Sequence, residues 1–264
     1  MKTIAVVCQK GGVGKTTTVI NLASVLSKKG LKTLIIDTDP QGNVSTYLNQ
    51  NKTSELNTST TQILEGENNI EPIKVFENLY LIPSDVDIKK HNSEKIVGGS
   101  KLRKIRQNET IKTFDIVFID TPPTMSSLVQ EALSTSDYYF IPSKPEFLAV
   151  EGVGQAMSFA KQTISEVPHT DPHFLGVVLN QVDTRRASYH DFVSELKQIL
   201  SDKLFTTHIS QLTEIADSPF YAKTVLDFSE YSKARIEFEA LSSELLERLA
   251  YEKIPKFAYR KYRC

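Results

Sequence analysis

The sequence has few cysteines, no long apolar run and no histidines at metal-ligand spacing. Its only cysteines, Cys8 and Cys264, stand at opposite ends of the 264 residues. This excludes a disulfide framework, a Cys-x-x-Cys metal knuckle and, within one chain, the ligand set of an iron–sulfur cluster. The five histidines are scattered, so structural or surface roles are expected for them.

Apolar residues make up 40% of the chain, but they never form the run of 18 or more residues that a membrane-spanning helix needs. The N-terminal apolar stretch from Ile4 to Cys8 is too short for the core of a signal peptide. A charged content of 24%, with Gly and Pro at 11 each, is typical of a globular chain. We therefore expect a folded cytoplasmic protein, with one domain over residues 1–250 and a basic tail at 251–264.

The formal net charge of −1 hides two basic segments. Lys89 to Lys112 holds eight Lys and Arg against two Glu, a net charge of +6, and residues 251–264 carry +4. The rest of the chain carries −11. Two interpretations stay open: solvated helix surfaces, or contact with a polyanion, which would be nucleic acid or an anionic lipid surface.

Short apolar runs alternate with stretches of helical periodicity. The runs that predict buried strands are Thr3 to Cys8, Thr33 to Ile36, Phe114 to Ile119, Tyr138 to Ile141 and Phe174 to Leu179. Helices are predicted between the first run and Gly30, at 126–134, 146–167 and 189–201, and at the leucine stripe of 241–249, and a surface loop at 49–61. Wholly apolar strands separated by helices predict a doubly wound α/β fold, a mostly parallel sheet with helices on both faces.

A glycine-rich stretch lies between the first strand and the first helix. It reads Lys10-Gly11-Gly12-Val13-Gly14-Lys15-Thr16-Thr17. Glycines let successive backbone N–H groups turn toward a phosphate, and the helix N-terminus adds its positive dipole end. We expect Lys15 to reach the β- and γ-phosphates, the Thr16 hydroxyl to coordinate Mg²⁺, and Thr17 to contact the α-phosphate. The pattern predicts a P-loop NTPase architecture.

Two further strands end in carboxylates. Asp37 and Asp39 follow the second strand, and Asp120 ends the strand that begins at Phe114, as in a Walker B motif. A carboxylate near the γ-phosphate can position an attacking water, although Asp37 and Asp39 also suit a helix cap and a turn. Asp120 is expected to hold Mg²⁺ or one of its waters.

One departure from the common loop, G-x-x-x-x-G-K-[ST], points to a family, because Gln9 stands where the first glycine is expected. The form K-G-G-x-x-K-[ST] resembles the deviant Walker A loop of the ParA/MinD branch of P-loop ATPases. Residues 37–43 are similar to the D-x-D-P-Q-G-N stretch of the ParA family. The resemblance implies ATP as the nucleotide, Lys10 as the lysine that reaches across a dimer interface, and Asp39 as the residue that orients the lytic water.

The resemblance extends over most of the chain. Asn78 to Ile88 and Lys144 to Gln155 look like two further segments of the family. Leu179 to Asp183 resembles the segment whose Asn recognises adenine, which implies that Asn180 reads the base, although a turn or strand-end role also suits it. Ser218-Pro219 occupies the place of the family's A-P-S turn, which puts Pro219 beside the base.

The resemblance also implies a DNA partner, but the basic residues that would contact DNA differ from those of the family. DNA-binding members commonly carry arginines upstream of this turn, whereas Ser210 to Ile215 has no basic residue. Non-specific DNA binding depends on Lys and Arg at the phosphates, so other cations must supply it. The candidates are Lys223, Lys233, Arg235, Lys256, Arg260, Lys261 and Arg263. The tail cations also fit a frayed end.

We therefore expect a ParA/Soj-type partition ATPase, a homodimer with ATP that binds non-specific DNA and is released by slow hydrolysis. A centromere-binding partner protein would stimulate hydrolysis, and the ATP-bound protein would associate with the nucleoid. The alternative is a MinD-like ATPase at a membrane surface. Pro255 would interrupt a C-terminal amphipathic helix, so DNA is favoured over the membrane.

Overall fold

The computed structural model describes the chain except for residues 49–57, 94–95, 97–98, 147–148, 187 and 251–264. Its centre is a seven-stranded sheet of order β3-β4-β2-β5-β1-β6-β7. The strands are β1 (Lys2–Val6), β2 (Thr33–Asp37), β3 (Ile73–Phe76), β4 (Leu79–Ile82), β5 (Ile116–Asp120), β6 (Tyr138–Ser143) and β7 (His173–Leu179). Neighbouring strands are parallel except β3 and β4. The predicted fold class is confirmed.

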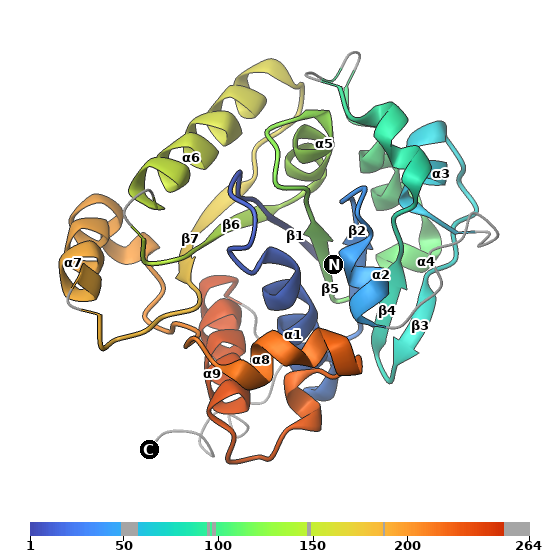
Figure 1. Cartoon of the computed structure of the whole chain (residues 1–264). Coiled ribbons are helices and arrows are strands. Elements are labelled where there is room, and N and C mark those ends of the chain that lie inside the picture. Colours follow the sequence, from blue (N-terminus) through green and yellow to red (C-terminus); the bar gives the residue numbers. More distant parts are fainter. Residues whose placement is uncertain (49–57, 94–95, 97–98, 147–148, 187, 251–264) are drawn as a thin grey trace.

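Helices cover both faces of the sheet (Figure 1). On one face lie α1 (Lys15–Lys28), α2 (Asn43–Tyr47) and α9 (Lys233–Arg248), and on the other lie α5 (Ser127–Thr135), α6 (Ala149–Glu166) and α7 (Ser188–Leu200). Successive side chains of a strand point to opposite faces, so Ile4 packs in the core with α1 and α9 while Ala5 packs in the core with α5 and α6. The sheet thus separates two apolar cores.

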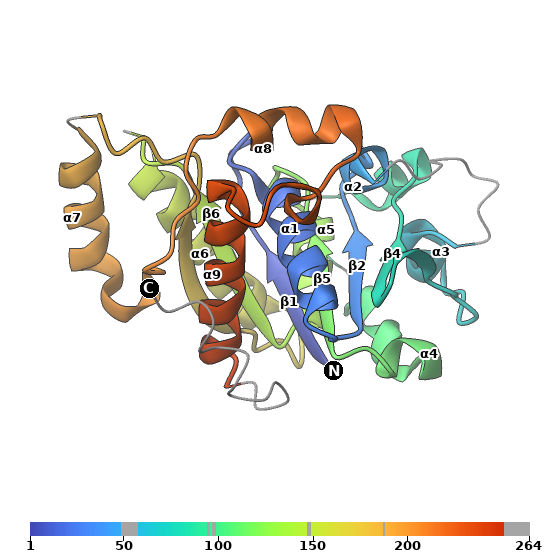
Figure 2. The same cartoon turned by 90° about the horizontal axis from the view of Figure 1, so that it is seen from below.

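Short helices occur in the connections between the strands and the main helices. They are α3 (Thr60–Glu65), η1 (Val86–His91), η2 (Leu102–Gln107), α4 (Glu109–Lys112), η3 (Ser201–Lys203), α8 (Thr213–Asp217), η4 (Ser218–Tyr221) and η5 (Val225–Asp227). Figure 2 shows α8 along the edge where the parallel strands end, and α4 with the C-terminal end of α9 toward the opposite edge. The elements at the ends of the parallel strands therefore surround the candidate site, and those at the strand starts lie on the opposite side of the molecule.

The five predicted strands and the main helices are present, with shifted ends. The helix predicted at 146–167 begins at Ala149. Most of the loop predicted at 49–61 lies outside the described residues, and its end already belongs to α3, which Ser59 caps by accepting a hydrogen bond from the Gln62 N–H. β3 was not predicted, because this edge strand alternates half-buried and exposed residues without a continuous apolar run.

Among the residues described, no helix is both long enough and apolar enough to cross a bilayer.

Candidate nucleotide site

The predicted phosphate-binding residues meet where the parallel strands end. Asp37 and Asp120 are the last residues of β2 and β5 and face each other in register, and Val6 of β1 pairs with Asp120 from the other side. The loops that follow these strands therefore start within a few ångströms of one another. This edge is where open α/β sheets bind their ligands.

The glycine-rich loop between β1 and α1 needs glycine at two of its positions. Gly12 and Gly14 have φ angles of 71° and 87°, in the left-handed region that other residues rarely adopt. At Gly14 a Cβ would also lie 3.0 Å from the Asn180 Nδ2. Gly14 thus allows the loop to pass directly against the end of β7.

Lys15 folds back over the loop that precedes it. Only 7% of its surface is exposed, and its Nζ donates to the backbone carbonyl of Cys8 at 3.2 Å. Burial lowers the pKa of Lys15, and the nearby carboxylates of Asp120 and Asp39 oppose that shift. The ammonium is therefore held inside the loop by weak neutral contacts that a phosphate could replace.

Thr16 and Asp120 form a donor set that fits Mg²⁺. The Thr16 hydroxyl donates to the Asp120 Oδ2 at 2.7 Å. The second carboxylate oxygen, Oδ1, is buried and has no hydrogen-bond partner among the described residues. Mg²⁺ prefers oxygen ligands and keeps several waters, so a hydroxyl and a carboxylate beside a phosphate loop suit it.

The two buried carboxylates at the strand ends resist ionisation together. Burial raises the pKa of Asp120 to about 7, while the Thr16 hydroxyl and the Lys15 ammonium oppose the shift. Burial and the nearby Asp120 also raise the pKa of Asp37 well above its ordinary value. A bound divalent cation would relieve this repulsion.

Asp39 and Asp37 have different surroundings. Asp37 is fully buried, and its two oxygens accept hydrogen bonds from the backbone N–H groups of Asp39 and Val44. Asp39 is 5% exposed and accepts one such bond, from the Gln41 N–H at 2.9 Å. Asp37 therefore shapes the turn, whereas Asp39 lies near enough to Lys15 for its carboxylate to oppose the lowering of that lysine's pKa by burial.

Lys10 is paired within its own chain. Its Nζ lies 2.5 Å from an oxygen of Glu146, and both side chains are about two-fifths exposed. The hydrogen bond from Lys10 lowers the pKa of Glu146. Ion pairs with this exposure contribute roughly 0–1 kcal/mol, so the contact is easily exchanged for another.

Asn180 lies at the end of β7 and touches the phosphate loop. Its Nδ2 donates to the Val13 carbonyl at 2.9 Å and to the Thr18 hydroxyl at 2.8 Å. Its Oδ1 is buried and has no hydrogen-bond partner among the described residues. The amide is thus held in one orientation, with its oxygen free to accept a hydrogen bond. A residue that only formed a turn or ended a strand would not need such a buried acceptor.

The turn at Ser218-Pro219 is tied to α1 through two buried polar side chains. The hydroxyl of Tyr47 on α2 hydrogen-bonds the Ser218 hydroxyl and accepts from the Asn21 amide of α1. Asn21 also donates to the Thr17 carbonyl and accepts from the Val225 N–H. This network links Thr17, next to the phosphate loop, with both sides of the Pro219 turn.

The candidate DNA-contacting residues differ from one another in exposure and in ion pairing. Lys223 is exposed, with its Nζ 5.9 Å from the centre of the Tyr221 ring. Lys233 lies 3.7 Å from Glu237, and Arg235 is held by Glu239 at 3.0 Å and has a largely buried side chain. The candidates in the tail, Lys256, Arg260, Lys261 and Arg263, lie outside the described residues. DNA contact by this set stays a prediction.

Sequence reasoning missed the residues that support the site. Glu146, Tyr47 and Asn21 belong to segments whose partners are distant in the chain, so no local motif marks them. Asn21 alone carried a signal, because its amide stands within the otherwise largely apolar stretch from Val19 to Leu26 of a predicted helix. A buried polar residue there needs a partner, and the partner is the Thr17 carbonyl.

Comparison with known proteins places this site in a family. A family profile described as an AAA domain matches residues 1–171. The sporulation initiation inhibitor protein Soj of Bacillus subtilis is 30% identical over 248 residues, which cover 92% of this chain and 98% of Soj. The chromosome partitioning protein ParA of Caulobacter vibrioides is also 30% identical, covering 94% of this chain and 95% of ParA.

The chain belongs to the ParA/Soj-type P-loop ATPases. The predicted family is thereby confirmed. Among solved structures, a putative plasmid partition protein of Borrelia burgdorferi bound to AMPPNP is similar, with a TM-score of 0.75 and 25% identity. That similarity covers 94% of this chain and 99% of the Borrelia protein, so the whole ParA/Soj-type fold is shared.

Proposed function

We propose that this protein is a partition ATPase whose ATP-bound homodimer binds DNA non-specifically and is released by hydrolysis. The observation that carries the proposal is the meeting of Lys15, Thr16, Asp39 and Asp120 at one strand edge. The ParA relative bears the name of a chromosome partitioning protein, and the Borrelia relative is a putative plasmid partition protein bound to an ATP analogue. Residues 1–250 would form one ATPase domain, acting in the cytoplasm on the nucleoid.

In this proposal the phosphate loop holds ATP through its backbone. Gly11 to Gly14 and the first turn of α1 present N–H groups to the phosphates, and Thr17 contacts the α-phosphate. Lys15 exchanges the Cys8 carbonyl for the β- and γ-phosphates, and Thr16 and Asp120 hold Mg²⁺. When bound, Mg²⁺ neutralises charge on the β- and γ-phosphate oxygens.

Base recognition falls to Asn180 and Pro219. The unpartnered Oδ1 of Asn180 can accept a hydrogen bond from the exocyclic amino group of adenine, whereas the O6 of guanine would repel it. Pro219 lines the base from the turn that Tyr47 and Ser218 fix. The pair would select ATP over GTP.

Hydrolysis requires Asp39 and a second subunit. Asp39 orients the water that attacks the γ-phosphate, with general-base catalysis as the stronger form of the same role. Lys10 leaves Glu146 and reaches the partner's nucleotide, which joins dimerisation to the presence of ATP. A centromere-binding partner protein would speed the slow reaction and so time the release from DNA.

One experiment separates this function from its alternative. The purified protein is sedimented with plasmid DNA and, separately, with anionic vesicles, each in ATP and in ADP, and its mass in both nucleotides is measured by light scattering. The proposal expects an ATP-dependent dimer that sediments with DNA. An ATP dimer that ignores DNA and sediments with vesicles would favour the MinD-like alternative.

A further inference from the structure

The strongest basic surface of the described chain lies on the side away from the nucleotide site. Residues 99–112 carry five Lys and Arg against Glu109 alone, a net charge of +4. They form η2 and α4, and Figure 2 shows α4 at the edge where the parallel strands begin. The phosphate loop occupies the opposite edge.

This segment is held rigidly against α5. The buried carboxylate of Glu131 accepts hydrogen bonds from the Ser100 hydroxyl at 2.6 Å and from the Leu102 N–H at 2.9 Å. A 3₁₀-helix has three residues per turn, so η2 has three rows of side chains. One row, Leu102 and Ile105, is buried, and the cations therefore occupy the two outer rows.

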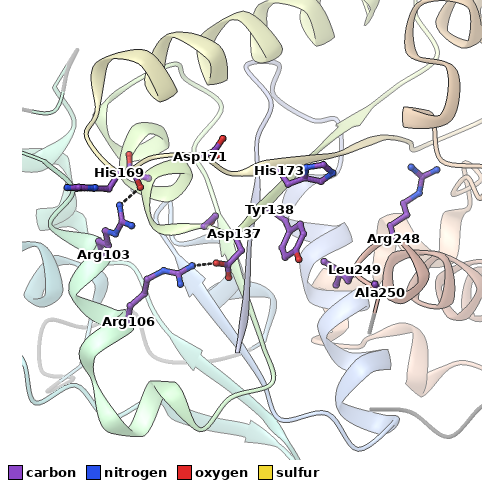
Figure 3. A pocket seen from close by; sticks show the side chains of 12 residues that line it. Arg103, Arg106, Asp137, Tyr138, His169, Asp171, His173, Arg248, Leu249 and Ala250 are labelled. Carbon is purple, nitrogen blue, oxygen red and sulfur yellow. Dashed lines mark hydrogen bonds and ion pairs between the residues drawn. The ribbon is translucent and has the colours of Figure 1, made fainter. Parts of the chain in front are cut away.

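One outer row borders a cavity of about 590 Å³. Arg103 and Arg106 line it together with Tyr138, Asp171 and the exposed imidazoles of two histidines (Figure 3). The histidines are His169 and His173. The cavity lies between η2, the first residues of β6 and β7, and the end of α9.

The charges around this cavity are not balanced. Arg106 pairs with Asp137, and Arg248 pairs with Glu244 at 2.9 Å. Arg103 instead donates to the backbone carbonyl of His169, and no carboxylate of the described residues forms an ion pair with it (Figure 3).

Two further lysines lie at this end of the sheet. Lys2 donates to the Tyr138 hydroxyl at 3.0 Å, and Lys101 is exposed at the start of η2. No carboxylate among the described residues forms an ion pair with Lys2, Lys101 or Arg103, so the exposed Asp171 is outnumbered. These three cations are called the basic edge below.

The surface that holds Lys223, Lys233 and Arg235, the other candidates for DNA contact, has a net negative charge. Residues 210–239, which contain Lys223, Lys233 and Arg235, hold three cations against six carboxylates, a net charge of −3. Exposed aromatic side chains dominate it, with Phe220 at 87% and Tyr231 at 89% exposure. A net negative surface repels DNA phosphates, and this weakens the case for DNA contact there.

We propose that the basic edge is the surface on which this protein binds the phosphate backbone of DNA, with Arg103 at the mouth of the cavity taking one phosphate. The inference rests on the proposed partition function and names its contact surface. Arg suits phosphate because its guanidinium can donate two parallel hydrogen bonds. Of the exposed large apolar side chains in the described chain, only Met1, at 37% exposure, adjoins the basic edge, and none lies in residues 99–112. The surface therefore offers little apolar area to a membrane.

The position of the basic edge explains how ATP could control DNA binding. In a dimer closed through the phosphate loops, the two basic edges would point outward and stay free. Each protomer would contact DNA weakly, and the dimer would present two such surfaces on its opposite sides. Where two DNA segments, or a DNA long enough to bend back, engage both surfaces at once, the apparent affinity rises without any new kind of contact. The surface would thus be present in the monomer and become effective in the dimer.

The test compares two double variants of the full chain. Lys101→Gln with Arg103→Gln removes two charges of the basic edge, and Lys223→Gln with Lys233→Gln removes two charges of the negative surface. Binding of a labelled DNA duplex is followed by fluorescence anisotropy over a series of salt concentrations, with ATP and with ADP. ATP affinity and thermal unfolding are measured in parallel, and Arg103→Lys tests whether a retained charge rescues binding.

We expect the basic-edge variant to bind DNA about tenfold more weakly per lost contact at 0.1 M salt, with the slope of log affinity against log salt flatter by about 0.9 per contact. The negative-surface variant should bind like wild type. A basic-edge variant with wild-type affinity and slope overturns the inference while the partition function stands. A wild-type ATP dimer that binds phosphatidylglycerol vesicles but no DNA overturns the proposed function itself.

Discussion

Lys10 and Lys15 lie five residues apart in one loop but have different surroundings. Lys15 is buried beside the Cys8 carbonyl, whereas Lys10 is partly exposed and paired with Glu146. Lys15→Ala should therefore weaken ATP binding about 10- to 100-fold, the effect of losing a hydrogen bond to a charged group. Lys10→Ala should spare most ATP binding and abolish dimerisation and hydrolysis. Calorimetry and light scattering measure the two effects, and equal losses of ATP affinity would remove the case for a cross-subunit Lys10.

The same reasoning separates the two carboxylates after β2. Asp39→Ala should leave ATP bound and the dimer formed, because the lost group serves the water rather than the phosphates. Hydrolysis should fall about 10²- to 10⁴-fold, the range of a general base. A variant that stays monomeric in ATP would instead make Asp39 structural. Asp37→Asn is the matched comparison, and it should lower the melting temperature because Asp37 holds two backbone N–H groups.

Asp120 links the proposed Mg²⁺ site to stability. Its pKa is raised from 3.8 to about 7 by burial, so between these pH values the folded protein keeps a proton that the unfolded chain has lost. Stability therefore falls as the pH rises from about 4 to 7. Asp120→Asn removes this cost, by a few kcal/mol at most, and should raise the melting temperature of the nucleotide-free protein more at pH 8 than at pH 5. A gain that is equal at both pH values would contradict the assigned burial effect.

At the scale of elements, the predictable ones were the strands with a continuous apolar run and the helices whose apolar residues recur periodically or whose ends are marked by glycine. β1, β2, β5, β6 and β7 are buried on both faces along most of their length, so each contains a continuous apolar run. β3 has one exposed row and pairs antiparallel with β4, and such short edge strands leave little pattern. The cavity beside η2 was also unpredictable, because it forms from strand starts and helix ends far apart in the chain.

The contact of α2 with η4 is an element-level feature that can be tested alone. Tyr47→Phe removes a buried hydroxyl that bonds Ser218 and Asn21, which should cost about 1 kcal/mol and lower the melting temperature by about 2–4 °C. ATP affinity should also fall if this contact positions the Pro219 turn. A double-mutant cycle with Ser218→Ala measures the coupling between the two hydroxyls. Additive effects would show that the turn is held by other contacts.

At the scale of the molecule, the basic edge and the candidate nucleotide site lie at opposite ends of the strands of one sheet. The glycine-rich loop and the acidic, aromatic surface around α8 lie where the parallel strands end, and Figure 2 shows α8 there. The basic edge lies at the other end, at the start of β1 and at η2, which borders the first residues of β6 and β7. The composition of residues 89–112 left solvated helix surfaces and a polyanion contact as alternatives. The place of this segment could not be predicted, because it depends on how η2 packs on α5 through Glu131. The loop between β1 and α1 was predictable because its glycines stand close together between an apolar strand and a helix. Phosphate binding by its residues stays a prediction.

The C-terminal tail provides the last test, at the scale of the whole molecule. Deleting residues 254–264 removes Lys256, Arg260, Lys261 and Arg263 without altering a nucleotide motif. ATP binding and dimerisation should survive, and each lost phosphate contact should flatten the plot of log affinity against log salt by about 0.9.

The deletion is measured beside the Lys101→Gln, Arg103→Gln variant and in combination with it. If tail and basic edge contact separate phosphates, their effects on the salt slope should add, since each released counterion counts once. If the truncated dimer keeps the full affinity and slope, the tail makes no contact and the basic edge alone must account for DNA binding. A truncation that abolishes all binding while the basic-edge variant binds normally would place the DNA surface on the tail instead.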